Sequence, residues 1–305
     1  MFIHLHGHSH YSLLDGLWTP KEIVKKAKEL GMHSIAITDH GVGYGMVEFY
    51  EIANKEGIKP ILGVEAYITY DMKQKNKTSK TFHLVLLAKN FQAYKNIIKL
   101  ISLAHLEWFY RKPRIDFDLL EKYSEWIIWL SACAGGEISR MITENEPTAK
   151  IEERILFYKE LFGGEFYLEI QPREYNLYDF QKKINDKMFE LAKATDTKVV
   201  VTMDYHYIDK TDREAHDVLI CMQTGKKYYD KERMKYDWDF HILSENELRE
   251  KLEDMAISYE NIDEVISNTE LVAKKCEIDL GLHKLLFPKF EIPEKYENLY
   301  KKLAN

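Results

Sequence analysis

The 305 residues are 45% hydrophobic and 30% charged, a composition typical of a soluble globular protein with one large domain or two ordinary ones. The sequence has no run of about 18 apolar residues and no basic segment followed by an apolar stretch, so we expect neither a transmembrane span nor a signal peptide. A formal charge of −7 argues against a protein surface that binds duplex DNA by itself. Bound divalent cations would, however, make the local electrostatic potential positive and allow a nucleic-acid substrate.

Short apolar, β-branched runs predict seven strands, and apolar residues at helical spacing predict helices between them. The strands are expected at 2–6, 33–38, 59–68, 82–88, 126–132, 165–170 and 198–202, and helices at 20–30, 46–56, 181–195 and 257–275. Thr19 is expected to cap the first helix, with Pro20 at its first position. Strands that alternate with helices indicate a parallel α/β architecture, either a barrel or a doubly wound sheet.

Two segments fall outside this alternation. Residues 71–81 are polar and lysine-rich, which predicts a loop. We expect residues 1–280 to form one domain. Residues 281–305 are expected to form an extended linker that enters a further helix, as if the natural polypeptide continued.

The three cysteines, Cys133, Cys221 and Cys276, are widely spaced, and no CxxC pair is present. An odd number of separated cysteines is not a disulfide framework and favours a reducing compartment. We therefore predict a cytoplasmic protein.

The stretch HLHGHSHYSLLDG, residues 4–16, is rich in histidine. Because side chains at i and i+2 of a strand share a face, His6 and His8 are expected to project together, as two imidazoles of a metal site do. The alternation differs from the contiguous run of an affinity tag. The stretch alone leaves metal binding and a surface accident as alternatives of equal weight.

Polar residues border nearly every predicted strand, and functional residues of parallel α/β folds gather at strand carboxyl ends. Singly, most have a structural explanation: His83 as a satisfied core histidine, Cys133 as a small buried hydrophobe, Asp39 as a helix cap. Glu65 inside an apolar strand does not, because a lone buried carboxylate is costly. The set comprises His6, His8, Asp15, Asp39, His40, Glu65, His83, Cys133, Asp204 and His206, with Asp204 and His206 again at i, i+2. Such a mixture favours zinc, manganese or iron over calcium or magnesium.

At these motifs the chain closely resembles the PHP domain of the bacterial replicative DNA polymerase III α subunits. The resemblance is carried by HLHGHSHYSLLDG, AITDHGVGYGMVEFY, GIKPILGVEAYI, FHLVLLAKN, YRKPRID, LSACAGGEI, and DYHY followed by AHDVLICMQTG. It implies an α/β fold, a distorted seven-stranded (β/α)7 barrel of the PHP type, with three divalent metal ions at its C-terminal face. It also makes residues 281–305 a linker toward a polymerase palm domain.

The family's nine ligand positions all carry metal-capable residues here. By this resemblance, one ion is held by His6, His8 and Asp204, a second by His83 and Cys133 with Glu65 shared between the two, and a third by Asp15, His40 and His206. Catalytic roles are assigned to Glu65, Asp204 and His206. Some family members have lost several ligands and with them the activity, whereas this chain keeps the complete set. Met203 replaces the family's common asparagine but is not a ligand position.

The resemblance implies metal-dependent hydrolysis of a phosphodiester, with 3′–5′ proofreading of a DNA end as the expected reaction. Arg111, Lys112 and Arg114 are candidates for holding the DNA backbone, with a structural basic loop as an equal alternative. Two other functions stay open: a free phosphoesterase acting on a small phosphorylated metabolite, and a structural or docking module. The expected partners are a DNA 3′ end, the remaining polymerase domains and a separate proofreading subunit, and no membrane is expected.

Two further patterns imitate other active sites. Asp116 and Asp118 resemble the paired carboxylates of a polymerase palm, but we interpret Asp118 as a helix cap. Gly41, Gly43 and Gly45 lack the GxGxxG spacing of a dinucleotide loop. We expect them to let the backbone approach the metal cluster closely.

Overall fold

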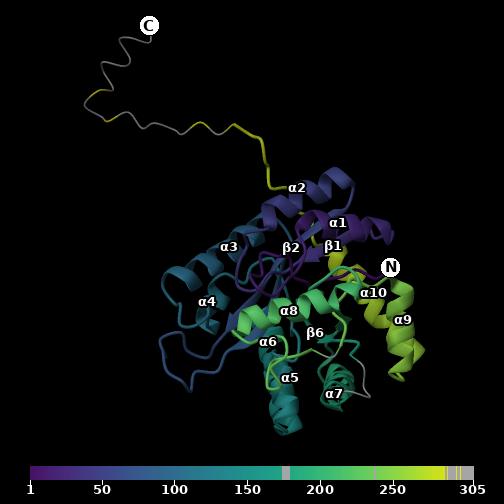
Figure 1. The fold of residues 1–305 in the computed structure, drawn as a ribbon. Coiled ribbons are helices and arrows are strands. Elements are labelled where there is room, and N and C mark those ends of the chain that lie inside the picture. Colours follow the sequence, from purple (N-terminus) through teal and green to yellow (C-terminus); the bar gives the residue numbers. More distant parts are fainter. Residues whose placement is uncertain (174–178, 237, 286, 288–292, 294–295, 297–305) are drawn as a thin grey trace.

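The computed structural model describes residues 1–173, 179–236, 238–285, 287, 293 and 296. Its strands are β1 (Ser34–Ile37), β2 (Lys59–Ile68), β3 (Phe82–Ala88), β4 (Arg114–Ile115), β5 (Ile127–Leu130), β6 (Phe166–Ile170) and β7 (Val199–Val201). Its helices are α1 (Pro20–Glu29), α2 (Met46–Glu56), α3 (Phe91–Leu106), α4 (Phe117–Lys122), α5 (Glu137–Thr143), α6 (Thr148–Leu161), α7 (Asp179–Thr195), α8 (Arg213–Thr224), α9 (Glu245–Asp254) and α10 (Tyr259–Lys275), with a 3₁₀ turn, η1 (Lys210–Asp212). The helices surround the sheet (Figure 1).

The strands form one sheet in the order β1-β2-β3-β5-β6-β7, with β4 beside β2. Neighbouring strands are parallel except that β3 runs antiparallel to both β2 and β5. The prediction of a purely parallel sheet is therefore wrong at β3. Because β3 is reversed, its first residues lie at the same end of the sheet as the carboxyl ends of the other strands, and His83 pairs with Tyr67 near the end of β2.

The N-terminal segment joins the two outer strands of this order. It was predicted as a strand, but it forms an extended stretch with an isolated bridge between Gly7 and Tyr205. On one side the Ala36 N–H of β1 donates to the His4 carbonyl at 2.8 Å, and on the other the His8 N–H donates to the Tyr205 carbonyl, after β7, at 2.7 Å. These bonds close the sheet into the barrel that the sequence predicts.

Alternate residues of the strands pack on opposite sides of the barrel wall, as strand geometry requires. Leu84 and Leu86 of β3 belong to the cluster that packs against the helices, whereas Val85 and Leu87 pack with inward-facing residues of the other strands. Residues of α10 join this inner cluster. The Lys275 ammonium of α10 lies 2.6 Å from the Glu165 carboxylate just before β6, so α10 closes the barrel at the amino-terminal ends of its parallel strands and leaves the other end open.

The predicted helices at 46–56, 20–30, 181–195 and 257–275 correspond to α2, α1, α7 and α10, with ends that agree within two residues. Thr19 is the N-cap residue of α1 and Pro20 its first residue, but the Thr19 hydroxyl bonds to the Glu22 carboxylate and not to a backbone N–H. Residues 71–81 form a loop between β2 and β3, as predicted. Among the described residues, no helix has the length and apolar character needed to cross a bilayer.

Two local interpretations are corrected. Asp116, not Asp118, caps α4, because its carboxylate accepts the Leu119 N–H at 3.1 Å. A Cβ on Gly41, whose φ is +62°, would lie 2.8 Å from Pro113, so this glycine permits close packing of a neighbouring loop and not an approach to the metal ligands. Most of the linker predicted at 281–305 lies outside the described residues, and the boundary at residue 280 stays a prediction.

Candidate metal centre

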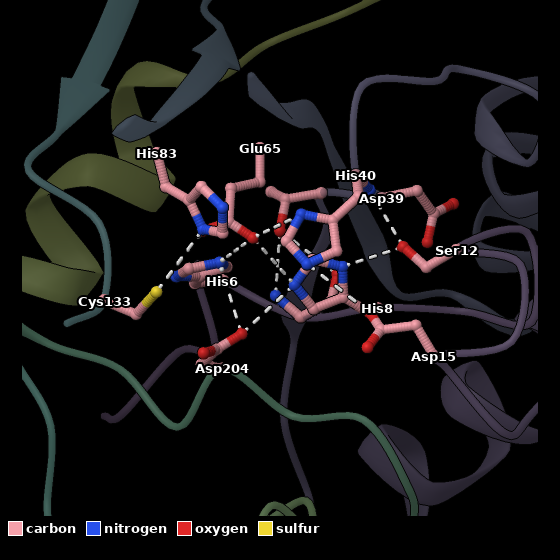
Figure 2. A network of polar contacts seen from close by, with 12 residues as sticks. His6, His8, Ser12, Asp15, Asp39, His40, Glu65, His83, Cys133 and Asp204 are labelled. Carbon is pink, nitrogen blue, oxygen red and sulfur yellow. Dashed lines mark hydrogen bonds and ion pairs between the residues drawn. The ribbon is translucent and has the colours of Figure 1, made fainter. Parts of the chain in front are cut away.

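All nine predicted ligands meet at the open end of the barrel, and Figure 2 labels each of them except His206. They come from the N-terminal segment (His6, His8, Asp15), the loop after β1 (His40), β2 (Glu65), β3 (His83), the turn after β5 (Cys133) and the turn after β7 (Asp204, His206). His83 lies near the start of β3, whereas the ligands on the other strands lie near or after their carboxyl ends. The reversal of β3 is the reason that His83 reaches the same end of the barrel.

The first group of ligands contains two imidazoles and two carboxylates, all buried. The Nε2 atoms of His6 and His8 each lie 3.2 Å from Glu65 Oε2. Asp204 Oδ1 lies 3.3 Å from His6 Nε2 and 3.1 Å from His8 Nε2. The prediction that His6 and His8 project together is confirmed.

The pairing of Asp204 with His206 has a different origin from the one predicted. Strand β7 ends at Val201, and Asp204 has a left-handed φ of 51°. The two side chains therefore do not share a strand face. Asp204 turns toward His6 and His8, while His206 Nε2 lies 3.3 Å from Asp15 Oδ2.

The second group lies on the other side of Glu65. The Glu65 Oε1 atom is 2.9 Å from His83 Nδ1, and the Cys133 thiol is 3.6 Å from both of these atoms. Ala132, in left-handed conformation with φ 62°, provides the turn between β5 and the cysteine. Cys133 is thus not a small buried hydrophobe, and His83 is not an isolated core histidine.

The third group faces the mouth of the barrel. Asp15 Oδ2 lies 3.3 Å from His206 Nε2 and 3.4 Å from His40 Nε2. The Nδ1 atom of His40 is 2.9 Å from Glu65 Oε2, and its ring stacks on that of His8 with centroids 4.3 Å apart. His40 therefore connects the third group to the other two.

Several buried polar atoms of the centre make no hydrogen bond within the described residues: His6 Nε2, Asp15 Oδ2, His40 Nδ1 and Glu65 Oε2. Their contacts to neighbouring atoms of the centre, at 2.9 to 3.4 Å, lack hydrogen-bond geometry. Buried polar atoms without hydrogen bonds are costly, so these atoms call for a further partner. Three sets of donor atoms have all members within 4.8 Å of one another: His6, His8, Glu65 and Asp204; His40, Glu65 and His83; and His8, His40 and His206. The residues fit divalent metal ions, because imidazole, carboxylate and thiolate are their usual ligands.

The charges of the centre are strongly coupled. Burial by itself lowers the pKa of His8, but hydrogen bonds and charges of Asp204 and Glu65 raise it to about 10. Burial would raise the pKa of Glu65, yet the imidazoles of His40, His83 and His6 hold it well below its usual range. Burial, and then the Glu65 carboxylate, raises the pKa of the Cys133 thiol. The carboxylates thus stay ionised and attract positive charge, which protons or cations can supply.

Glu169 of β6 is a functional candidate that the sequence reasoning missed. Its buried carboxylate accepts hydrogen bonds from His6 Nδ1 at 2.9 Å and from the Thr202 hydroxyl at 2.6 Å. Holding the proton on Nδ1 leaves His6 Nε2 free to face the other ligands, a common arrangement around metal-bound histidines. Like Glu65, Glu169 is a carboxylate inside an apolar strand, and the cost of burying a lone carboxylate is the sequence signal that marks it.

A hydroxyl and a second carboxylate hold the histidine-rich loop. The Ser12 Oγ atom lies 2.9 Å from His8 Nδ1 and accepts the His40 N–H at 2.8 Å. Asp39 accepts from the N–H and hydroxyl of Ser9, the former at 2.7 Å, and burial raises its pKa to about 6. The prediction that Asp39 caps the following helix is wrong, because the N-cap residue of α2 is Gly45.

The three basic residues proposed to hold DNA are placed differently from one another. Arg114 is buried, and its guanidinium donates to the carbonyls of Met72 and Gln74 in the 71–81 loop. Arg111 and Lys112 are exposed. The Lys112 ammonium lies 4.9 Å from the ring centroid of Tyr67, whose ring in turn stacks on His40 at 5.6 Å.

A cavity of 270 Å³ opens onto the centre. Seven of the ligands line it: Asp15, His40, Glu65, His83, Cys133, Asp204 and His206. Its remaining wall includes Arg173, Phe180, Tyr236, Trp238 and Phe240. Two wider surface grooves, of 630 and 730 Å³, contain none of the nine ligands.

The closed barrel, with a buried cluster of imidazoles and carboxylates at one end, is typical of metal-binding α/β barrels. Comparison with known proteins is more specific. The PHP domain family matches residues 4–173, more than half of the chain, and the chain therefore belongs to the PHP family.

Similar proteins include DNA polymerase III subunit alpha of Borreliella burgdorferi, 40% identical over 98% of this chain and 26% of the relative. The same subunit of Helicobacter pylori strain 26695 is 39% identical over 92% of this chain and 23% of the relative. The chain thus spans about a quarter of the length of these relatives. A solved two-domain protein of Bacteroides vulgatus, described as containing a predicted PHP-like metal-dependent phosphoesterase, aligns with a TM-score of 0.43 and 15% identity over 74% of this chain and 56% of that one.

Proposed function

We propose that this chain is a metal-dependent phosphodiesterase that removes nucleotides from a DNA 3′ end, and that it belongs to a bacterial replicative polymerase α subunit in which this reaction is proofreading. The observation that carries the proposal is the completeness of the nine-residue ligand set around Glu65, whose two oxygens face separate groups of donors. A module whose metals were vestigial would have no need of all nine.

The three groups of donors support a centre of three divalent ions, of zinc, manganese or iron. Such ions supply Lewis acidity to a phosphoryl oxygen and lower the pKa of water to near neutrality. Glu65, whose two oxygens face separate groups of donors, would contribute to holding two of the ions. Asp204 and His206 both line the cavity, so they would hold ions beside the scissile phosphate. Hydrolysis breaks the bond from phosphorus to the 3′ oxygen of the shortened strand, and water supplies the new oxygen.

The choice of DNA rests on the relatives, which are DNA polymerase III subunits, and on cations near the cavity. Arg111 and Lys112 are exposed on the loop that contacts Tyr67, so they are the members of the basic trio suited to a phosphate backbone. Arg114 would act through the 71–81 loop that it holds. The proposed partners are the remaining polymerase domains and a separate proofreading subunit.

The test is release of nucleotides from a 3′-labelled single strand by metal-loaded protein, with metal content counted in the same samples. His8→Ala and Asp204→Ala should lose both cleavage and metal. His33→Ala changes a histidine that is half exposed and away from the centre, and it should behave as wild type. Full metal loading without cleavage of any DNA end would overturn the proposal in favour of a docking role, and preferential hydrolysis of a small phosphomonoester would overturn the choice of substrate.

A further inference from the structure

The cavity has a second wall that the hydrolytic chemistry does not use. Tyr236, Trp238 and Phe240 stand at alternate positions of one short segment, and all three line the cavity together with Phe180 of α7. Seven of the predicted metal ligands line the same cavity. The aromatic wall formed by Tyr236, Trp238 and Phe240 thus faces the metal centre.

The aromatic wall, formed by Tyr236, Trp238 and Phe240, has one buried residue and two that are partly exposed. Phe240 is buried, packs edge-on against the ligand His206 with centroids 4.8 Å apart, and carries the Arg173 guanidinium 4.1 Å from its centroid. Tyr236 and Trp238 contact Phe240 at 5.0 and 5.8 Å and are partly exposed. Because Phe240 touches a ligand, the wall has a fixed position relative to the centre.

The two walls suit the two parts of one nucleotide. Ligands for divalent cations recruit a phosphate, and aromatic faces recruit a planar base by stacking, without regard to its sequence. A cavity of 270 Å³ is slightly below the usual range of ligand pockets, about 300 to 1,000 Å³, so it suits one nucleotide unit and not a duplex. An aliphatic phosphorylated metabolite would gain little from three aromatic rings.

We propose that Tyr236 and Trp238 stack the base of the 3′-terminal nucleotide of a single strand while its phosphodiester lies at the metal centre. The inference rests on the proposed function, since it names the part of the substrate that the centre does not hold. The aromatic wall would thereby select an unpaired DNA end, because a base within a duplex cannot enter the cavity without leaving its stack.

The experiment uses the whole chain, loaded with zinc, and a single-stranded oligonucleotide with 2-aminopurine as its 3′-terminal base and a phosphorothioate as its last linkage. Stacking quenches 2-aminopurine fluorescence. Quenching is expected with the wild type and should be lost in Trp238→Ala, whose Kd should rise about tenfold. Trp238→Phe should restore most of it. Trp126→Ala is the matched control, because Trp126 is half exposed and precedes β5 at the other end of the barrel.

Equal quenching by wild type and Trp238→Ala, or no binding of the oligonucleotide, would overturn the inference. Quenching of the free 2-aminopurine nucleotide but not of the oligonucleotide would overturn the assignment to a DNA end. The two proposals fail separately. Quenching without cleavage of ordinary DNA would refute the hydrolysis and leave the stacking, whereas equal cleavage of strands with normal and abasic 3′ ends would refute the stacking and leave the hydrolysis.

Discussion

Replacing Glu169 by glutamine tests whether the residues behind the ligands set the metal affinity. The Glu169 carboxylate accepts hydrogen bonds from His6 Nδ1 at 2.9 Å, the Thr202 hydroxyl at 2.6 Å and the Gln171 amide at 3.1 Å, all through Oε1. Glutamine keeps the size and one acceptor oxygen but removes the negative charge that favours the proton on Nδ1. Its amide would also occupy the position of Oε2, which has no hydrogen-bond partner among the described residues.

The expected loss is about 10- to 100-fold in metal affinity, or about 1.4 to 2.7 kcal/mol, the range typical of residues that orient a metal-bound histidine. Affinity is measured by competition with a chromogenic zinc chelator, and circular dichroism monitors the fold. Glu121→Gln, a change at an exposed position of α4, serves as the control for the loss of one charge. If Glu169→Gln and Glu121→Gln both bind zinc as tightly as the wild type, the Glu169 carboxylate does not contribute to the metal affinity of His6.

Three other predictions concern Asp15, His8 and Arg154. Asp15→Asn should lower the metal content by about one ion per chain, measured by elemental analysis; an unchanged content would contradict the third site. In chelator-treated protein, burial lowers the pKa of His8, but the Asp204 and Glu65 carboxylates raise it from its usual 6.5 to about 10. Its stabilisation is therefore complete below pH 6.5 and is lost as the pH rises toward 10, so the Tm should fall over that range, and less so in His8→Ala. Arg154→Met leaves the buried Glu137 carboxylate without the guanidinium whose Nε lies 2.9 Å from both its oxygens, and urea unfolding should show a loss of about 3 kcal/mol. A loss within error of zero would mean that the hydroxyls of Tyr70 and Tyr158, which also donate to this carboxylate, suffice.

Helices and most strands of this protein could be predicted from sequence because their signals are local. The apolar spacing of residues 46–56 defines α2 to the residue, and the β-branched runs locate β2 and β3. His6 and His8 could be paired for the same reason, since two residues apart in an extended segment is a short-range relation.

The direction of β3 is not a local property. Its residues favour a strand in either orientation, and the turn of the chain through the 71–81 loop makes it antiparallel to β2. That reversal delivers His83 to the open end of the barrel. The role of Arg114 is likewise hidden from the sequence, because a basic residue in a basic loop gives no sign that its guanidinium is buried under the carbonyls of Met72 and Gln74.

The sequence by itself determined the kinds of ligands and the elements that carry them, because residue type and hydrophobic period are written into short stretches of chain. Only the tertiary structure decided which ligand faces which. Glu65 meets His83 on one side and His6 on the other, Asp204 reaches the first group through a left-handed turn, and Glu169 stands behind His6. Pairing of β2 with the reversed β3 brings Glu65 to His83, and closure of the barrel brings the N-terminal segment to Glu65, Asp204 and Glu169; no local pattern encodes either relation.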